Sequence, residues 1–137
     1  MRLKDVKPVK LRRLIKEFLS WYPQLKSKTY AVGRCWDMTK EFIDIARSRK
    51  LKGDLRAIKA DKLPEYKKYD DSHWIVWIDG LHIDFTARQF HPSFTHPRIW
   101  RGTHRCSLIQ WGDKRKNDLG IDRYIDAWEY IPNVRDK

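Results

Sequence analysis

The sequence predicts an α+β domain in which a helix packs against a small antiparallel β-sheet. Three observations lead to this fold class. Residues 8–22 and residues 35–50 carry apolar side chains at helical spacing, and residues 73–86 alternate in polarity on both sides of an Asp-Gly pair. A chain of 137 residues with 41% hydrophobic residues is long enough to form one domain, residues 1–137, with its own core.

The helix predicted over residues 8–22 has one apolar face. The residues on this face follow i, i+3, i+4, i+7 spacing: Leu11, Leu14, Ile15, Phe18, Leu19 and Tyr22. Pro8 suits the first turn, and Pro23 ends the helix because proline lacks an N–H and restricts the residue before it. The apolar face is therefore expected to pack on the core, with the basic residues largely in solvent: Lys10, Arg12, Arg13 and Lys16.

A second helix is expected from about Cys35 to Lys50. One face of it would carry Met38, Phe42, Ile45, Ala46 and, at its end, Arg49. Asp37 lies in the first turn and Arg47 in the last, as the helix dipole favours. Gly33 loosens the chain before this helix, and Gly53 marks its stop.

The strands are expected in the second half of the chain. Residues 54–60 predict a short strand, residues 61–72 a polar loop, and residues 73–86 a hairpin whose Asp79-Gly80 turn is a strong hairpin signal. By period two, one face of the hairpin belongs to the core: Trp74, Val76, Ile78, Leu81, Ile83 and Phe85. The remaining segments are expected to be irregular at 87–105, a strand at 106–111, a charged loop at 112–120, and either strand or helix at 124–131.

The charge and the apolar runs limit the location and the partners. The formal net charge of +12 favours acidic partners such as nucleic acid, acidic proteins or anionic surfaces. No apolar run approaches the roughly 20 residues that span a bilayer, and no apolar signal-peptide core follows Met1. We therefore expect a cytoplasmic protein, not bound to a membrane, whose two cysteines stay reduced.

The hairpin is expected to bring a histidine and an aspartate together. A two-residue turn places Ile78 opposite Leu81, which puts His73 and Asp84 on the non-core face as diagonal neighbours. Their Cβ atoms would then lie on the order of 7 Å apart, close enough for an imidazole–carboxylate hydrogen bond. His82 shares this face.

Cys35 supplies the remaining part of a nucleophilic site. A reactive cysteine needs an environment that favours the thiolate, a base, and a group that orients the base. The tip of a helix offers a partial positive charge and free N–H donors, which can also stabilise an oxyanion. The residues predict Cys35 as nucleophile, His73 as base and Asp84 as the group that orients His73.

The motifs around these residues resemble a known family. In chain order they are Gly33-Arg34-Cys35-Trp36 at the start of a helix, His73-Trp74-Ile75-Val76, Asp79-Gly80, and Asp84-Phe85-Thr86-Ala87-Arg88-Gln89-Phe90. This order, over about residues 33–90, resembles the transglutaminase-like branch of the papain-like cysteine protease superfamily, especially its small microbial members. The resemblance implies a papain/transglutaminase-like core with Cys35, His73 and Asp84 as the catalytic triad. Phe85 departs from the family pattern, where proline is frequent, and the substrate class stays open.

The resemblance implies a cysteine-dependent amide hydrolase or acyl transferase that works through a thioester. Its substrate would be a protein or peptide with a Gln or Asn carboxamide or a peptide bond. The acyl group would pass to water, as in a thiol protease or deamidase, or to an amine, as in a transglutaminase. Hydrolysis is slightly favoured because water is always present and the sequence contains no recognisable amine-binding feature. No organic cofactor or metal is required.

Three further residues are weaker candidates for substrate or oxyanion contacts. Trp36 would wall the cleft or simply pack, and Gln89 would line the cleft or anchor the loop after the hairpin. His82 would contact substrate, although a surface histidine beside a turn is common. Cys106 lacks such a setting and is expected in the core.

A metal site is considered because four ligand-type residues gather in one stretch: His91, His96, His104 and Cys106. Structural zinc sites use pairs of ligands separated by two to about five residues, repeated twice. These spacings do not match that pattern, so we predict no metal site.

The alternative function is a non-enzymatic basic module that binds nucleic acid or an acidic protein. It rests on the Lys and Arg content and on aromatic residues that could stack on bases: Trp100, Trp111 and Tyr124. No recognisable nucleic-acid-binding motif accompanies them, and the basic residues are spread along the chain.

Overall fold

The computed structural model describes residues 1–53, 55–60, 63, 65–69 and 71–101, and the backbone of strands at 104–106, 124–126 and 130–132. The α-helices are α1 (Val9–Trp21), α2 (Lys28–Ala31) and α3 (Cys35–Ser48). Short 3-10 helices are η1 (Leu3–Asp5), η2 (Pro23–Lys26), η3 (Lys67–Tyr69) and η4 (Ala87–Gln89). The strands are β1 (Leu55–Lys59), β2 (Trp74–Ile78), β3 (Leu81–Asp84), β4 (Arg98–Arg101), β5 (His104–Cys106), β6 (Tyr124–Asp126) and β7 (Tyr130–Pro132).

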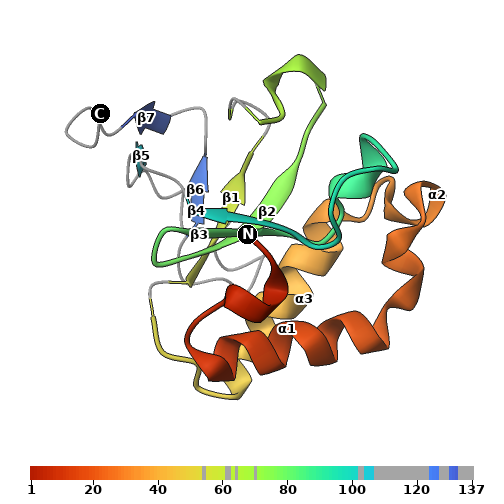
Figure 1. The fold of residues 1–137 in the computed structure, drawn as a ribbon. Coiled ribbons are helices and arrows are strands. Elements are labelled where there is room, and N and C mark those ends of the chain that lie inside the picture. Colours follow the sequence, from red (N-terminus) through yellow and green to blue (C-terminus); the bar gives the residue numbers. More distant parts are fainter. Residues whose placement is uncertain are drawn as a thin grey trace.

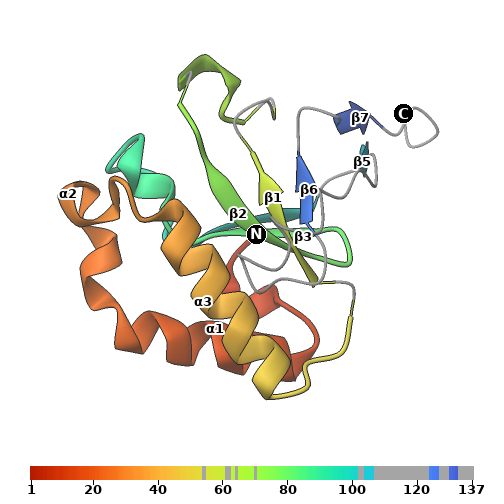
Figure 2. The ribbon, with the colours of Figure 1, turned by 180° about the vertical axis from the view of Figure 1, so that it is seen from behind.

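Five of the described strands form one sheet in the order β4-β3-β2-β1-β6. The first four are antiparallel to their neighbours, and β6 joins β1 in parallel. Helices α1 and α3 lie together on one side of this sheet, while β5 and β7 pair separately (Figure 1 and Figure 2). The predicted α+β class, with a helix on a small antiparallel sheet, is confirmed. No helix within the described ranges is long and apolar enough to span a membrane.

The two long helices form where the apolar spacing predicts them. In α1 the buried residues are Leu11, Leu14, Ile15 and Phe18, and the helix ends just before Pro23. In α3 they are Met38, Thr39, Phe42, Ile43 and Ala46. The predicted buried face of α3 is therefore only partly right. Ile45 is half-buried and Arg49 is exposed, and Thr39 and Ile43 are buried in their place.

The hairpin has the predicted turn and register. Asp79 and Gly80 both have positive φ, 47° and 89°, as a two-residue type I′ turn requires. Ile78 pairs with Leu81, and all six residues of the predicted core face belong to one cluster with the helices.

Two stretches differ from the sequence-based expectation, and a third, expected as either strand or helix, contains strands. The stretch 87–105 is not wholly irregular, because β4 lies within it and pairs with β3. The ambiguous stretch at 124–131 contains strand β6 and the start of β7, and β5 begins earlier than the strand predicted over 106–111. Of that predicted strand, residues 107–111 lie outside the described residues, as does the loop at 112–120.

The face of the sheet opposite the helices is also buried, although the sequence predicted it to lie outside the core. A second hydrophobic cluster covers it: Ile58, Ala60, Leu63, Tyr66 and Ile75, with half-buried Tyr69, Trp77, Phe90 and Trp100. Part of the predicted polar loop at 61–72 therefore turns inward.

Candidate active site

Cys35 is the first residue of α3 and a free, half-buried thiol. Gly33 reaches the helix through a φ of +78°, a conformation that glycine adopts without strain. Among the described residues, no side chain caps the helix start. The thiol thus lies beside the N–H groups of the first turn, at the helix start where the sequence predicts it.

An aromatic contact fixes the start of α3 against the start of β2. The ring of Trp36 packs on the ring of Trp74 with centroids 4.8 Å apart and an interplanar angle of 67°. Because Trp36 follows Cys35 and Trp74 follows His73, this contact brings the thiol and the imidazole to the same end of the sheet. Packing is therefore the role of Trp36 that is visible; a contact with substrate stays a prediction.

His73 and Asp84 make the hydrogen bond that the hairpin register predicts. Nε2 of His73 lies 2.6 Å from Oδ2 of Asp84, and both side chains are fully buried. The other carboxylate oxygen, Oδ1, accepts a hydrogen bond from the Thr86 backbone N–H at 2.9 Å. The carboxylate is therefore held at both oxygens.

The thiol of Cys35 lies beside the ring of His73. Its proximity adds to the rise of the His73 pKa, after the larger effects of burial and Asp84. Nδ1, the ring nitrogen that Asp84 does not engage, has no hydrogen-bond partner within the described part of the chain. The thiol and the ring are therefore neighbours without a hydrogen bond at Nδ1.

The charges of the buried pair support one another. Burial on its own lowers the pKa of His73, but the charge of Asp84 and the hydrogen bond to it outweigh burial and raise the pKa to about 9. Burial raises the pKa of Asp84, yet His73, Tyr66 and the Thr86 N–H together hold that pKa below its usual value. At neutral pH the site therefore holds an imidazolium and a carboxylate.

Tyr66 is part of this site, although the sequence placed it in a polar loop. Its buried hydroxyl donates a hydrogen bond to Oδ2 of Asp84, and its ring meets the His73 ring edge-on at 4.7 Å. The ring of Phe90 also packs on the His73 ring, with the two ring centroids 4.7 Å apart. Only the aromatic character of Tyr66 inside a charged stretch could have singled it out.

The weaker candidates have different positions from those expected. His82 is not a surface residue: it is fully buried and stacks on Trp100 at 4.8 Å with an interplanar angle of 13°. Gln89 closes η4 and is 9% exposed, and its Oε1 has no hydrogen-bond partner among the described residues. An oxygen cannot donate to an oxyanion, so the orphaned atom gives no support to that role.

The stretch considered for a metal is only partly described. His91 is exposed and its Nδ1 accepts a hydrogen bond from the Ser93 N–H at 3.1 Å. His96 is half-buried, and burial together with the charges of Arg88 and Lys26 lowers its pKa to about 4. Across the described ranges no three His, Cys, Asp or Glu side chains are arranged around a metal position, and the side chains of His104 and Cys106 lie outside those ranges.

Comparisons of the chain with models of protein families, with curated proteins and with solved structures give no match.

Proposed function

We propose that the protein is a cysteine-dependent amide hydrolase or acyl transferase of the transglutaminase-like type, within a papain-like fold. The observation that carries the proposal is the chain of contacts from Cys35 through His73 to Asp84. The half-buried free thiol of Cys35 lies at the start of α3, beside buried His73. Nε2 of His73 is hydrogen-bonded to buried Asp84 at 2.6 Å. The order of elements, a cysteine-bearing helix followed by antiparallel strands that carry the histidine and aspartate, supports the fold assignment.

The first half of the reaction is an acyl transfer to sulfur. The Cys35 thiolate attacks the carbonyl carbon of a carboxamide or peptide bond, forming a C–S bond and a tetrahedral oxyanion. N–H groups of the first turn of α3 are in place to donate to that oxyanion. His73 then gives its proton to the amine as the C–N bond breaks, which leaves a thioester and a neutral imidazole.

The second half returns the enzyme to its starting state. Neutral His73 takes a proton from water, or from an amine, as that nucleophile attacks the thioester. The C–S bond breaks, the thiolate is restored, and the product is an acid or a new amide. Asp84 keeps Nε2 protonated throughout, so that Nδ1, which Asp84 does not engage, carries the mobile proton.

Alkylation of the cysteine tests the proposal without a known substrate. We expect iodoacetamide to modify Cys35 at least about tenfold faster in the folded protein than in the chain unfolded in guanidinium, and far faster than Cys106. His73→Ala should remove that advantage, whereas His91→Ala, a change at an exposed histidine, should leave it unchanged. Peptide mass spectrometry assigns the label to each thiol. Equal and slow labelling of both cysteines in the folded protein would overturn the proposal.

A substrate search follows from the same residue. Incubation with cell extract and mass spectrometry of acyl groups trapped on Cys35 would report the acyl donor directly. Release of ammonia from glutamine peptides would indicate deamidation, and incorporation of a fluorescent primary amine into protein would indicate transfer. Cys35→Ser is the matched control for every product.

A second candidate function, polyanion binding, is favoured by the division of charge along the chain. Lys and Arg are shared equally, with 15 in residues 1–53 and 15 in residues 54–137. The acidic residues are distributed unequally, with 5 Asp and Glu in residues 1–53 and 13 in residues 54–137. The segment that forms η1, η2 and the three α-helices therefore carries +10 of the net charge of +12.

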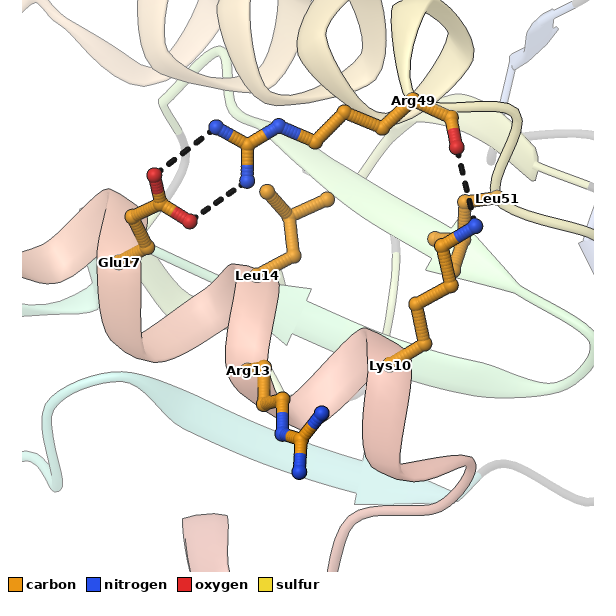
Figure 3. Close-up of a pocket in the computed structure, with 6 residues that line it drawn as sticks. All are labelled: Lys10, Arg13, Leu14, Glu17, Arg49 and Leu51. Atoms are coloured by element: carbon orange, nitrogen blue, oxygen red, sulfur yellow. Dashed lines mark hydrogen bonds and ion pairs between the residues drawn. The ribbon is translucent and has the colours of Figure 1, made fainter.

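Helix α1 presents these cations around two surface hollows. One, of about 230 Å³, lies between α1 and the end of α3, where Arg49 pairs with Glu17 through contacts of 2.5 and 2.8 Å and thereby neutralises the acid (Figure 3). Lys10 and Arg13 line the same hollow. The other, of about 260 Å³, is lined by Leu3, Lys4, Arg12 and Lys16. Of the aromatic residues considered for base stacking, Trp100 already stacks on the ring of His82. The side chains of Trp111 and Tyr124 lie outside the described residues.

Paired charge reversals test this second function. Fluorescence anisotropy with single- and double-stranded oligonucleotides, over a salt series, would compare R13E/K16E with K67E/K68E. Both variants change the net charge equally, but only the first lies on α1. We expect the α1 variant to lose affinity and to reduce the salt slope by about 2, and the η3 variant to bind almost as the natural chain does. Equal losses would indicate a net-charge effect only, and no binding at low salt would remove the function.

A further inference from the structure

Oδ2 of Asp84 receives two hydrogen bonds, from Nε2 of His73 and from the hydroxyl of Tyr66. Oδ1 accepts from the Thr86 N–H at 2.9 Å and, at a longer 3.4 Å, from the Thr86 hydroxyl. All four donors approach a carboxylate with no solvent exposure. Tyr66 and His73 therefore compete for the same negative charge.

The surroundings of Tyr66 make its hydroxyl an effective donor. The side chain is fully buried, and burial, followed by the charge of Asp84, raises its pKa, so the hydroxyl keeps its proton. The guanidinium of Arg98 lies 5.1 Å from the centre of the ring, and its positive charge opposes that rise. A positive charge close to a phenol strengthens its O–H as a hydrogen-bond donor, here toward Asp84.

Packing accounts for the ring of Tyr66 but not for its hydroxyl. The ring contacts His73, Phe90 and Trp100, and phenylalanine would make the same contacts. A buried hydroxyl costs free energy unless it is hydrogen-bonded, and here the partner is the carboxylate that orients the candidate base. The hydroxyl is therefore placed to act on the charge of Asp84.

We propose that Tyr66 is a positioning residue of the candidate active site. Its hydroxyl donates to Oδ2 of Asp84 and thereby weakens the hydrogen bond between that oxygen and the Nε2 proton of His73. The inference rests on the proposed function, in which His73 must release a proton to the leaving amine and then act as a base. A histidine bound to an unshared buried carboxylate would hold its proton too firmly to give it to the leaving amine. The hydrogen bond from Tyr66 offsets part of the negative charge of Asp84, so that His73 can give up its proton more easily.

The test measures the proton affinity of His73 and needs no substrate. Two-dimensional NMR of the protein labelled with 15N-histidine gives the pKa of the His73 ring. In Tyr66→Phe, which keeps the ring packing, we expect this pKa to rise by about half to one unit, because Oδ2 then bonds His73 alone. An unchanged or lower pKa in the folded variant would overturn the inference.

Two further variants make the result specific. Tyr69→Phe is the matched control, because Tyr69 stacks on Phe90 at 4.6 Å without reaching Asp84, and it should leave the His73 pKa unchanged. Incorporation of 3-fluorotyrosine at position 66 strengthens the donor at almost constant shape, so the His73 pKa should fall. That variant keeps the inference testable if Tyr66→Phe does not fold, and a rise or no change would count against it.

This experiment separates the inference from the proposed function. A slow, unselective alkylation of Cys35 with the expected His73 shifts would mean that the buried network exists without thiol catalysis. Rapid alkylation of Cys35 without any His73 shift would mean that the enzyme works without control by Tyr66.

Discussion

The helix-covered face of the sheet buries apolar side chains, whereas the opposite face buries the charged pair His73 and Asp84 beside a second hydrophobic cluster. Ile83 and Asp84 are neighbours on β3, point to opposite faces, and have no solvent exposure. Ile83 packs in the cluster with α1 and α3, whereas Asp84 lies on the other face with His73, beside the aromatic cluster. Equal burial therefore has two different physical origins within one strand.

The difference shows what each face needs in order to be stable. On the helix-covered face, removal of apolar surface from water is itself favourable. On the other face, burial opposes the charges of His73 and Asp84, and their mutual attraction and hydrogen bonds must offset it. The first face tolerates any apolar side chain of similar volume, but the second depends on every partner being present.

The largest effect is expected from removing one partner of the charged pair. Asp84→Ala leaves the His73 ring, the Tyr66 hydroxyl and the Thr86 N–H without their acceptor. We expect the free energy of unfolding at pH 6 to fall by about 3–5 kcal/mol, the range measured when a buried pair loses one member. Urea denaturation followed by circular dichroism measures the change.

The pH dependence of that variant separates charge from packing. Above pH 9, where His73 in the natural chain becomes neutral, the loss caused by Asp84→Ala should shrink. A loss of the same size at pH 6 and pH 9.5 would mean that volume, and not charge, decides the stability of this face.

The second effect is a fall in stability with rising pH that belongs to His73. Its pKa is raised to about 9 in the folded chain, against an unfolded value near 6.5, so the folded state binds the additional proton between these values. This stabilisation is complete below pH 6.5 and is lost as pH rises through 9. The total is on the order of 3 kcal/mol. Chemical denaturation at intervals between pH 6 and 10 would reveal it.

His96 gives the opposite slope in a separate window. Its pKa is lowered to about 4 in the folded chain, so between pH 4 and 6.5 the unfolded chain binds more protons and stability rises with pH. His73→Gln should flatten the alkaline limb only, and His96→Gln the acidic limb only. A profile in which His73→Gln leaves the alkaline limb intact would contradict the charge state assigned to the site.

The helix-covered face is also the part of the fold that could be predicted from the sequence. Helical spacing places α1 and α3, and period two with the Asp79-Gly80 turn sets the hairpin register. That register in turn brings His73 to Asp84. These features are local, because each depends on residues within one helix or one hairpin.

The other face depends on contacts between distant segments, which no local pattern records. Tyr66 reaches Asp84 from 18 residues away, out of a stretch that is polar in composition. His82 is buried because Trp100, on β4, covers it, and β4 itself forms only by pairing with β3. A period-two pattern shows which side chains share a face, but not what covers that face.

The smallest effect sharpens the comparison from the apolar side. Ile83→Val removes one methylene from a fully buried residue and changes no hydrogen bond, so we expect a loss of about 0.5–1.5 kcal/mol. The loss should be the same at pH 6 and pH 9.5, since no charge is involved, and the rate of Cys35 alkylation should not change. Denaturation of this variant beside Asp84→Ala, at both pH values, compares two adjacent residues of one strand. If the Ile83→Val loss varied with pH as the Asp84→Ala loss does, the two faces would be energetically coupled through β3, and the separate origins argued for their burial would not hold.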